Sequence, residues 1–255
     1  NAVTGIASAY LSRTPLLVMS ARVPDPQAGM GALEEVPQAD LVRPVCRYVR
    51  EISEARHVLP GLHLAATIAL GSDGPPGPGY VDFAPTLLKQ EMPGWYLDRQ
   101  WFLPVVRPAR LPHHDSIALA AQLLRSSRRP LAIGGRGARG SGSVVERFLE
   151  TSGCLYLDTR ESRGAVPPDN PHSVPALRAR AMAEADLVIT LGRRLDFELA
   201  YGSGAVFSES ARFIRIGRSA EELSENRCGD VVVCADVDAA LEALANARAR
   251  PAAAD

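Results

Sequence analysis

The segment Pro130-Leu-Ala-Ile-Gly-Gly-Arg-Gly-Ala-Arg-Gly140 decides the fold class of the second half of the chain. Its first five residues form a short apolar run that is typical of a buried strand. The glycines that follow predict a tight loop, and helical periodicity resumes over residues 144–151. A strand, a glycine loop and a helix in this order open a βαβ unit, so the segment predicts a parallel sheet.

The most specific local motif in this segment is Gly135-x-Gly137-x-x-Gly140. In dinucleotide-binding domains such glycines bring backbone N–H groups and a helix N-terminus close to a diphosphate. Three interpretations remain open. The loop binds NAD(P), with Asp158 after the next strand holding a ribose; it binds ADP or another dinucleotide; or it is a tight turn without a ligand.

Apolar runs alternate with helical periodicity along both halves of the chain, which predicts parallel sheets covered by helices on both faces. In the first half we expect helices over 2–11 and 54–70, and strands over 15–20, 45–49 and 80–83. In the second half we expect strands over 130–134, 154–158, 186–192, 213–216 and 231–233, with helices over 116–124, 144–151, 174–183 and 236–244. The predicted fold class is α/β, with two doubly wound parallel-sheet domains, the first incomplete and the second Rossmann-like.

Residues 87–112 interrupt this alternation with prolines and with aromatic residues that include Trp95 and Trp101. We interpret them as an interdomain linker that packs its aromatic side chains on a neighbour; a lid over a site is the alternative. Residues 1–86 are then the C-terminal part of a first domain, and residues 113–245 are a central nucleotide-binding-like domain. The Ala/Arg/Pro-rich residues 246–255 are predicted to be a linker tail.

The composition excludes several classes of function. The 255 residues carry a formal net charge of -1, so no overall field favours nucleic acid or an anionic membrane surface. No apolar run reaches membrane-spanning length, and no secretory signal opens the chain, so we expect a cytoplasmic protein. Lys89 is the only lysine, and no phosphate-binding GxxxxGK[ST] loop occurs. The four cysteines form no CxxC motif, and we interpret them as buried free thiols.

Arginines gather near the predicted carboxyl ends of the second sheet. Arg178 precedes a helix, and Gly192-Arg-Arg-Leu-Asp196 follows a buried strand. Arginines in that place can pair with phosphate in a forked geometry, although solvated surface arginines are the alternative. In the first half, Glu34 and Glu35 follow a glycine stretch, where adjacent carboxylates can be simple helix N-terminal charges.

Seven stretches in this order resemble the thiamine-diphosphate-dependent enzymes related to acetolactate synthase, oxalyl-CoA decarboxylase and 2-hydroxyacyl-CoA lyase. They are Asn1–Tyr10 with Thr14-Pro-Leu-Leu-Val-Met19, Gly31-Ala-Leu-Glu-Glu35, Arg43-Pro-Val-Cys-Arg47, Gly77-Pro-Gly-Tyr-Val-Asp-Phe83, Arg129-Pro-Leu-Ala-Ile-Gly-Gly135, Arg163-Gly-Ala-Val-Pro167, and Ala185–Asp196. The likeness covers nearly the whole chain except the linker. It is similar to the latter part of a pyrimidine-binding domain followed by a central domain.

The resemblance implies a three-domain enzyme in which thiamine diphosphate supplies a nucleophilic ylid. The glutamate that activates the cofactor would lie upstream of Asn1, and the GDG motif that binds diphosphate through Mg²⁺ is absent from this sequence. The family's active-site Gln is Glu34 here, which implies a catalytic position facing the bound intermediate, with Leu33 facing the substrate. A central nucleotide, ADP or FAD, would be lined by Gly134, Gly135, Arg136, Gly137, Arg178, Gly192, Arg194 and Asp196.

Several positions depart from the acetolactate synthase pattern. An arginine that contacts the central nucleotide is Pro75, and an acid after the strand at 213–216 is replaced by Gly217-Arg218, which argues against flavin. Glu34 itself resembles the acid of oxalyl-CoA decarboxylases. The chain is therefore interpreted as a fragment, inactive alone, of an acetolactate-synthase-type lyase or ligase acting on 2-oxo acids. Alternatives are an oxalyl-CoA decarboxylase or 2-hydroxyacyl-CoA lyase, a non-catalytic nucleotide-binding module, and an NAD(P)-dependent oxidoreductase. The resemblance also implies a homodimer or homotetramer, and no metal ligand is predicted within this chain.

Overall fold

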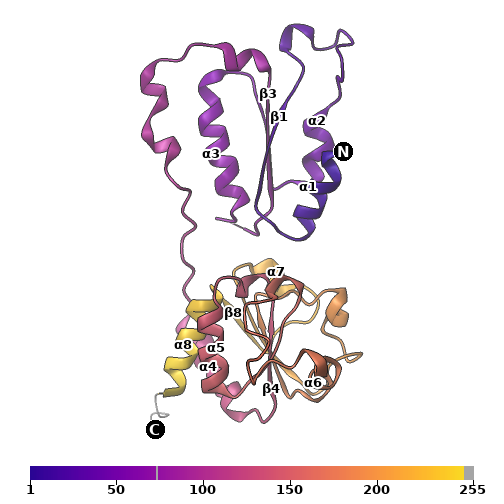
Figure 1. Cartoon of the computed structure of the whole chain (residues 1–255), viewed down its shortest axis with the longest axis vertical. Coiled ribbons are helices and arrows are strands. Elements are labelled where there is room, and N and C mark those ends of the chain that lie inside the picture. Colours follow the sequence, from indigo (N-terminus) through magenta and orange to yellow (C-terminus); the bar gives the residue numbers. More distant parts are fainter. Residues whose placement is uncertain (73, 250–255) are drawn as a thin grey trace. The chain divides into compact units, whose positions relative to one another are not determined.

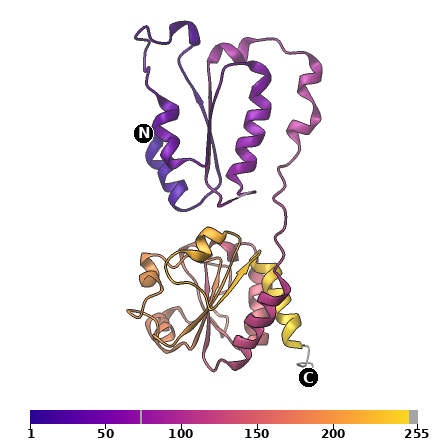
Figure 2. The same cartoon turned by 180° about the vertical axis from the view of Figure 1, so that it is seen from behind.

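The computed structural model describes residues 1–72 and 74–249, which form two compact units. Unit 1 comprises Asn1–Pro108 and unit 2 comprises Ala109–Asp255 (Figures 1 and 2). Each unit holds one parallel sheet, with three strands in the first and five in the second. The predicted α/β class with two parallel-sheet domains is confirmed.

In unit 1 the strands are ordered β1 (Leu16–Ala21), β3 (Pro78–Phe83), β2 (Tyr48–Ile52). The central strand β3 is buried over its first five residues, as expected for a strand covered on both faces. Helix α3 (Val58–Ala69) packs on one face around buried Ala65 and Val81. Helices α1 (Ala2–Leu11) and α2 (Gln38–Val42) cover the other face around Ile6, Ala39 and Tyr80.

Unit 2 has the strand order β5 (Leu155–Leu157), β4 (Pro130–Gly134), β6 (Leu187–Leu191), β7 (Arg212–Gly217), β8 (Val231–Cys234). In chain order this is 2-1-3-4-5, the second of the two common doubly wound orders. From β4 the chain adds its next strand, β5, on one side of the sheet, whereas β6, β7 and β8 are added on the other side, so the strand order reverses between β4 and β6. Ligands of doubly wound proteins bind beyond the carboxyl ends of the strands at such a switch point. We therefore expect a site at the carboxyl ends of β4 and β6.

Helices cover both faces of the second sheet. Helices α4 (His114–Ser126), α5 (Gly142–Ser152) and α8 (Val237–Ala249) share one core, which includes Phe148, Ile189 and Leu241 (Figure 1). A second core contains Leu131, Val188 and Phe213, with Met182 from α6 (Arg178–Glu184) and Leu199 from the 3₁₀ segment η10 (Phe197–Gly202). Helix α7 (Ala220–Ser224) follows β7.

Three 3₁₀ turns follow β3: Pro85–Lys89, Gly94–Leu97 and Arg99–Phe102. Tyr96 is buried, and its hydroxyl donates to the Ala55 carbonyl oxygen at 2.7 Å and accepts from the Leu59 N–H at 3.1 Å. The Trp101 ring meets the His63 ring edge-on at 5.9 Å. Residues 85–102 therefore pack on the rest of unit 1, while the domain boundaries drawn from the sequence stay predictions.

The structure moves several predicted boundaries. Three elements begin later in the sequence than predicted, because a 3₁₀ turn precedes each of them. Strand β2 follows the turn Arg43–Val45, α3 follows Ala55–His57, and α6 follows Pro175–Leu177. Helix α8 extends to Ala249, so the predicted tail at 246–255 is helical in its first four residues, and residues 250–255 lie outside the described part of the chain. Within the described residues, no helix combines the length and the apolar character needed to cross a membrane.

The prediction of buried thiols is wrong for Cys228. All four cysteines are free, but only Cys154 is buried, Cys46 and Cys234 are half-buried, and Cys228 is exposed. Cys228 lies in the loop between α7 and β8, where its side chain reaches solvent.

Candidate functional site

The carboxyl ends of β4 and β6 carry two glycine loops that contact each other. The Gly135 N–H donates to the Leu191 carbonyl at 3.0 Å, and the Gly137 N–H donates to the Gly192 carbonyl at 3.3 Å. A Cβ on Gly135 would lie 2.5 Å from the Arg193 Cα, and one on Gly137 would lie 2.8 Å from the Gly192 Cα. These glycines therefore let the two loops approach each other at the switch point.

Two further glycines of this region make room for other parts of the same unit. A Cβ on Gly134 would collide with the Tyr156 hydroxyl and lie 2.8 Å from the Ser162 hydroxyl. A Cβ on Gly142, the first residue of α5, would collide with the Ala165 carbonyl oxygen. Gly140, by contrast, has open space around it and takes a left-handed φ of 79°. It is a turn residue.

The arginines at this edge are paired with carboxylates of the same unit. Arg136 Nη2 lies 2.7 Å from Glu222 Oε1, and its Nη1 lies 3.5 Å from Glu161 Oε1. Arg194 Nη2 lies 2.7 Å from Glu225 Oε2. These carboxylates balance the positive charge that the sequence had suggested for a phosphate.

Arg193 is buried, and it makes the strongest of these pairs. Its Nη1 and Nη2 bind the two Asp196 carboxylate oxygens at 2.7 and 2.9 Å, and Nη2 also binds Glu198 Oε2 at 2.8 Å. Bidentate pairs of this kind fix geometry as well as charge. Asp196 also accepts from the Glu198 N–H at 3.0 Å, so its carboxylate holds the start of η10.

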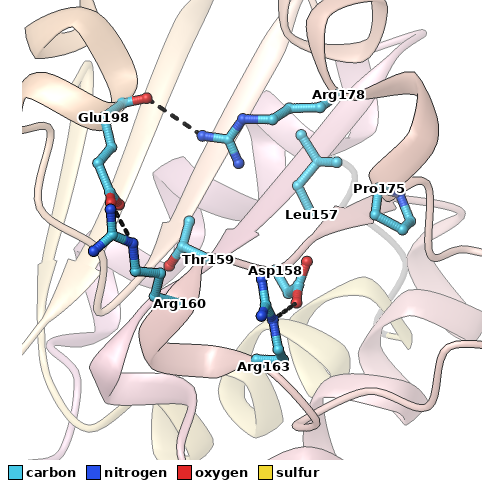
Figure 3. Close-up of a pocket in the computed structure, with 8 residues that line it drawn as sticks. All are labelled: Leu157, Asp158, Thr159, Arg160, Arg163, Pro175, Arg178 and Glu198. Carbon is cyan, nitrogen blue, oxygen red and sulfur yellow. Dashed lines mark hydrogen bonds and ion pairs between the residues drawn. The ribbon is translucent and has the colours of Figure 1, made fainter.

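A hollow of about 440 Å³ lies beyond β5, beside the switch point (Figure 3). Two residues named from the sequence, Asp158 and Arg178, lie in its wall, together with Leu157, Thr159, Arg160, Arg163, Pro175 and Glu198. The Arg178 guanidinium donates to the Glu198 carbonyl oxygen at 3.3 Å, which directs it across the hollow. Arg160 pairs with Glu198 at 2.9 Å, and Arg163 with Asp158 at 3.7 Å. Two of the three arginines are thus neutralised here too.

In unit 1 the structure brings Leu33 and Glu34 to a second hollow, of about 240 Å³. Ala21 and Arg22, at the carboxyl end of β1, form another part of its wall, with Val23, Pro24, Gln27, Ala32 and Gln38 completing it. The Leu33 side chain is 90% exposed, and Glu34 is exposed with a left-handed φ of 59°. A glutamate with positive φ is uncommon. The loop thus presents an apolar and an acidic side chain at the carboxyl edge of the sheet.

Glu35 holds this loop in place. Its carboxylate accepts from the Gly29 N–H at 2.5 Å and from the Ala32 N–H at 3.2 Å. The hydrogen bond from Gly29 is the main reason that the pKa of Glu35 lies below its ordinary value. The next helix begins only at Gln38, so neither Glu34 nor Glu35 is a helix N-terminal charge.

A buried acid that the sequence did not single out lies behind this hollow. Asp82, at the end of β3, is 1% exposed, and its Oδ1 lies 3.8 Å from Arg22 Nε. Burial is the first cause that raises the pKa of Asp82 to about 6, and the charge of Glu51 is the second. Arg22 also pairs with Asp25. A signal was present, because an acid within an otherwise apolar strand is seldom buried without a partner.

The comparisons with known proteins agree on one family. A family model described as "Thiamine pyrophosphate enzyme, central domain" matches residues 117–244, just over half of the 255-residue chain. The chain belongs to the thiamine pyrophosphate enzyme family. Unit 2 contains the whole of the matched range, so the five-stranded sheet and both glycine loops are the central-domain part of this family's architecture.

Relatives extend the likeness to nearly the whole chain. 2-Hydroxyacyl-CoA lyase 2 of Caenorhabditis elegans is 27% identical over 97% of this chain and 44% of its own length. Acetolactate synthase 1, chloroplastic, of Zea mays is 30% identical over 96% of this chain and 39% of its own length. The chain therefore spans less than half the length of these curated relatives.

A solved structure supports the fold independently. The X-ray structure assigned as a thiamin diphosphate-dependent enzyme from Mycobacterium smegmatis superposes with a TM-score of 0.77 and 19% identity. It covers 99% of this chain and 49% of the other. The expected membership in the thiamine-diphosphate-dependent enzymes is confirmed, whereas the roles assigned to individual site residues stay predictions.

Proposed function

We propose that the intact protein is a thiamine-diphosphate-dependent carbon–carbon lyase or ligase of the acetolactate synthase type, acting on 2-oxo acids. The observation that carries this proposal is the presence of Glu34 and Leu33 in the hollow beyond β1, in a chain of the thiamine pyrophosphate enzyme family. Ligand sites of parallel sheets lie at that edge.

A 2-hydroxyacyl-CoA lyase or oxalyl-CoA decarboxylase is the second candidate. It is favoured by Glu34, since an acid at this position resembles the oxalyl-CoA decarboxylases rather than acetolactate synthase. The two candidates differ in the fate of the reacting carbon, which is protonated in a simple decarboxylase and joined to a second carbonyl compound in a synthase.

When bound, thiamine diphosphate supplies a nucleophilic carbon and a sink for the electrons of the bond that breaks. The described residues contain no cluster of three or more His, Cys, Asp or Glu side chains that could hold a metal ion. We therefore assign no Mg²⁺ ligand among these residues.

Glu34 and Leu33 contribute different chemistry to the hollow. The Glu34 carboxyl can hold a proton or a negative charge beside the reacting atoms, which an amide in its place cannot do. Leu33 offers an apolar surface that would contact the substrate and displace water from it. Glu35 keeps both in position through its hydrogen bonds to Gly29 and Ala32.

Glu34→Gln in the intact protein tests this assignment. We expect an unchanged melting temperature and an altered ratio of protonated to carbon–carbon-joined product, measured with a 2-oxo acid and with a 2-hydroxyacyl-CoA. The matched control is Glu91→Gln, an exposed residue of the same unit that lies outside the hollow. If Glu34→Gln leaves both rate and product ratio as in wild type, Glu34 is only a surface charge.

We also propose that the intact protein is a cytoplasmic homodimer or homotetramer that requires Mg²⁺, and that residues 1–255 alone have no turnover. The near-neutral net charge of -1 supports a small-molecule substrate rather than nucleic acid or a membrane. Light scattering and the dependence of activity on Mg²⁺ test these points.

A further inference from the structure

The family resemblance implies ADP or FAD in the central domain, and the carboxyl edge of unit 2 shows whether its residues fit such a ligand. A bound diphosphate needs three things there: space at the switch point, free backbone N–H groups, and cations that are not already neutralised.

Between the ends of β4 and β6 the space is taken by the protein itself, and the hollow described above lies to one side, beyond β5. The loops after β4 and β6 contact each other through Gly137 and Gly192, and a Cβ on either glycine would meet the Cα of the other. The N-terminus of α5 is approached by the Ala165 carbonyl at Gly142. The Ala165 carbonyl oxygen thus lies beside the first residue of α5, on the side where a Cβ would point.

Several backbone donors of the glycine loop are also committed. Gly135 and Gly137 donate to carbonyls of the β6 end, and Ala138 donates to the Gly135 carbonyl at 3.0 Å. A diphosphate would have to break these bonds in order to use them.

Three of the arginines at this edge carry carboxylates from the same unit, whereas Arg178 binds a backbone carbonyl oxygen, that of Glu198. Arg136 is held between Glu222 and Glu161, Arg194 is held by Glu225, and Arg193 by Asp196 and Glu198. Arg136 and Glu222 are largely covered, with side chains 17% and 12% exposed, so their pairing is less screened by solvent than a surface pair. A ligand phosphate would have to displace the Glu222 carboxylate from Arg136.

We propose that the central domain of this protein has closed its diphosphate site, and that Glu222 and Glu161 take the place of ligand phosphates at Arg136. The domain folds and functions without ADP or FAD. This inference concerns unit 2 and does not depend on which carbonyl compound the intact protein converts.

The first arm of the test is ligand binding by the intact protein, saturated with thiamine diphosphate and Mg²⁺ so that the catalytic cofactor site is filled. We expect 1 mM ADP or FAD to leave the melting temperature unchanged and to give no heat of binding, because a ligand of the folded state would raise stability with its concentration. A concentration-dependent rise that disappears in Arg136→Gln, or a flavin that stays with the protein during purification, would overturn the proposal.

The second arm is a double-mutant cycle on Arg136→Gln and Glu222→Gln. We expect each single variant to lower the melting temperature, and the double variant to lose clearly less than the sum of the two. Glu150→Gln, an exposed carboxylate of α5, should have no effect and serves as the control. Additive losses in the cycle would show that Glu222 does not stand in for a ligand at Arg136.

Discussion

The Gly137 N–H donates a hydrogen bond to the Gly192 carbonyl oxygen, 3.3 Å away, and so joins the two loops that follow β4 and β6. The two residues are far apart in sequence but meet where doubly wound sheets ordinarily open a crevice. Glycines that suggest nucleotide binding in the sequence therefore allow two loops of the same unit to contact each other here.

Gly135→Ala is expected to destabilise unit 2 by about 3 kcal/mol, because the new methyl group collides with backbone atoms of Gly192 and Arg193 that cannot rotate away. Gly140→Ala is the matched control from the same motif. It has open space, and only its φ of 79° is unfavourable for alanine, which costs about 1 kcal/mol. Urea denaturation of both variants measures the difference. A cost at residue 140 equal to or above that at residue 135 would contradict the close contact of the loops.

Asp82→Asn is expected to flatten the pH dependence of unit 1 stability between pH 4 and pH 6. The pKa of Asp82 in the folded protein is raised from 3.8 to about 6, so the folded state binds the proton more tightly than the unfolded state. The contribution of the protonated Asp82 carboxyl to the free energy of unfolding is fully present below about pH 4, and it is lost as the pH rises through about 6. The shift of about two pH units corresponds to about 3 kcal/mol.

The asparagine variant should therefore match wild type near pH 4 and exceed it in stability at pH 7. Thermal unfolding across this range tests the expectation. Asp40→Asn, an exposed partner of Arg43, is the control and should leave the profile unchanged. A wild-type slope that persists in Asp82→Asn would place the titration elsewhere.

Arg215→Met is expected to destabilise unit 2 by about 3–5 kcal/mol. The fully buried Arg215 guanidinium donates to the carbonyl oxygens of Leu223, Glu225, Arg227 and Glu222 at 2.8–2.9 Å, and burial lowers its pKa. Methionine fills similar volume but leaves those carbonyls without a donor. Arg212→Met, at the exposed start of the same strand, should cost less than 1 kcal/mol, as exposed substitutions usually do. Equal losses would mean that the carbonyl bonds contribute nothing.

Cys228 is expected to react with a disulfide reagent faster than the other three cysteines under native conditions. It is exposed, whereas burial raises the pKa of the Cys46 thiol to about 11 and so lowers its thiolate fraction at neutral pH. Counting thiols over time should give a fast phase of one equivalent. Cys228→Ser should remove that phase, while Cys154→Ser should not.

The sequence predicted the fold more closely than the site. Strand β4 was placed with its observed bounds, since Pro130–Gly134 is a continuous apolar run that ends in glycine. Helices α2 and α7 were missed because five residues are too few to show helical periodicity. Pro44 lies within a 3₁₀ turn and Pro175 begins one, and at both places periodicity alone set the start of the next element too early.

The site residues show why local motifs are ambiguous. A glycine is needed both where a ligand approaches the backbone and where another loop does, and sequence spacing does not distinguish the two cases. At Arg136 the two cases are distinguished by the partners of its guanidinium. These partners are Glu161 and Glu222, which lie 25 and 86 residues further along the chain. Such contacts depend on the strand order, which one sequence does not reveal.

The chain that follows β3 contains a stretch that a protease should cut first, at residues 103–108. Tyr96 and Trp101 attach residues 85–102 to α3, whereas residues 103–108 are largely exposed and form neither helix nor strand. Proteases prefer exposed, extended segments. A limited digest with thermolysin should first cut beside Val105 or Val106, and the released N-terminal fragment should keep Tyr96 on its Ala55 and Leu59 partners and resist further cleavage.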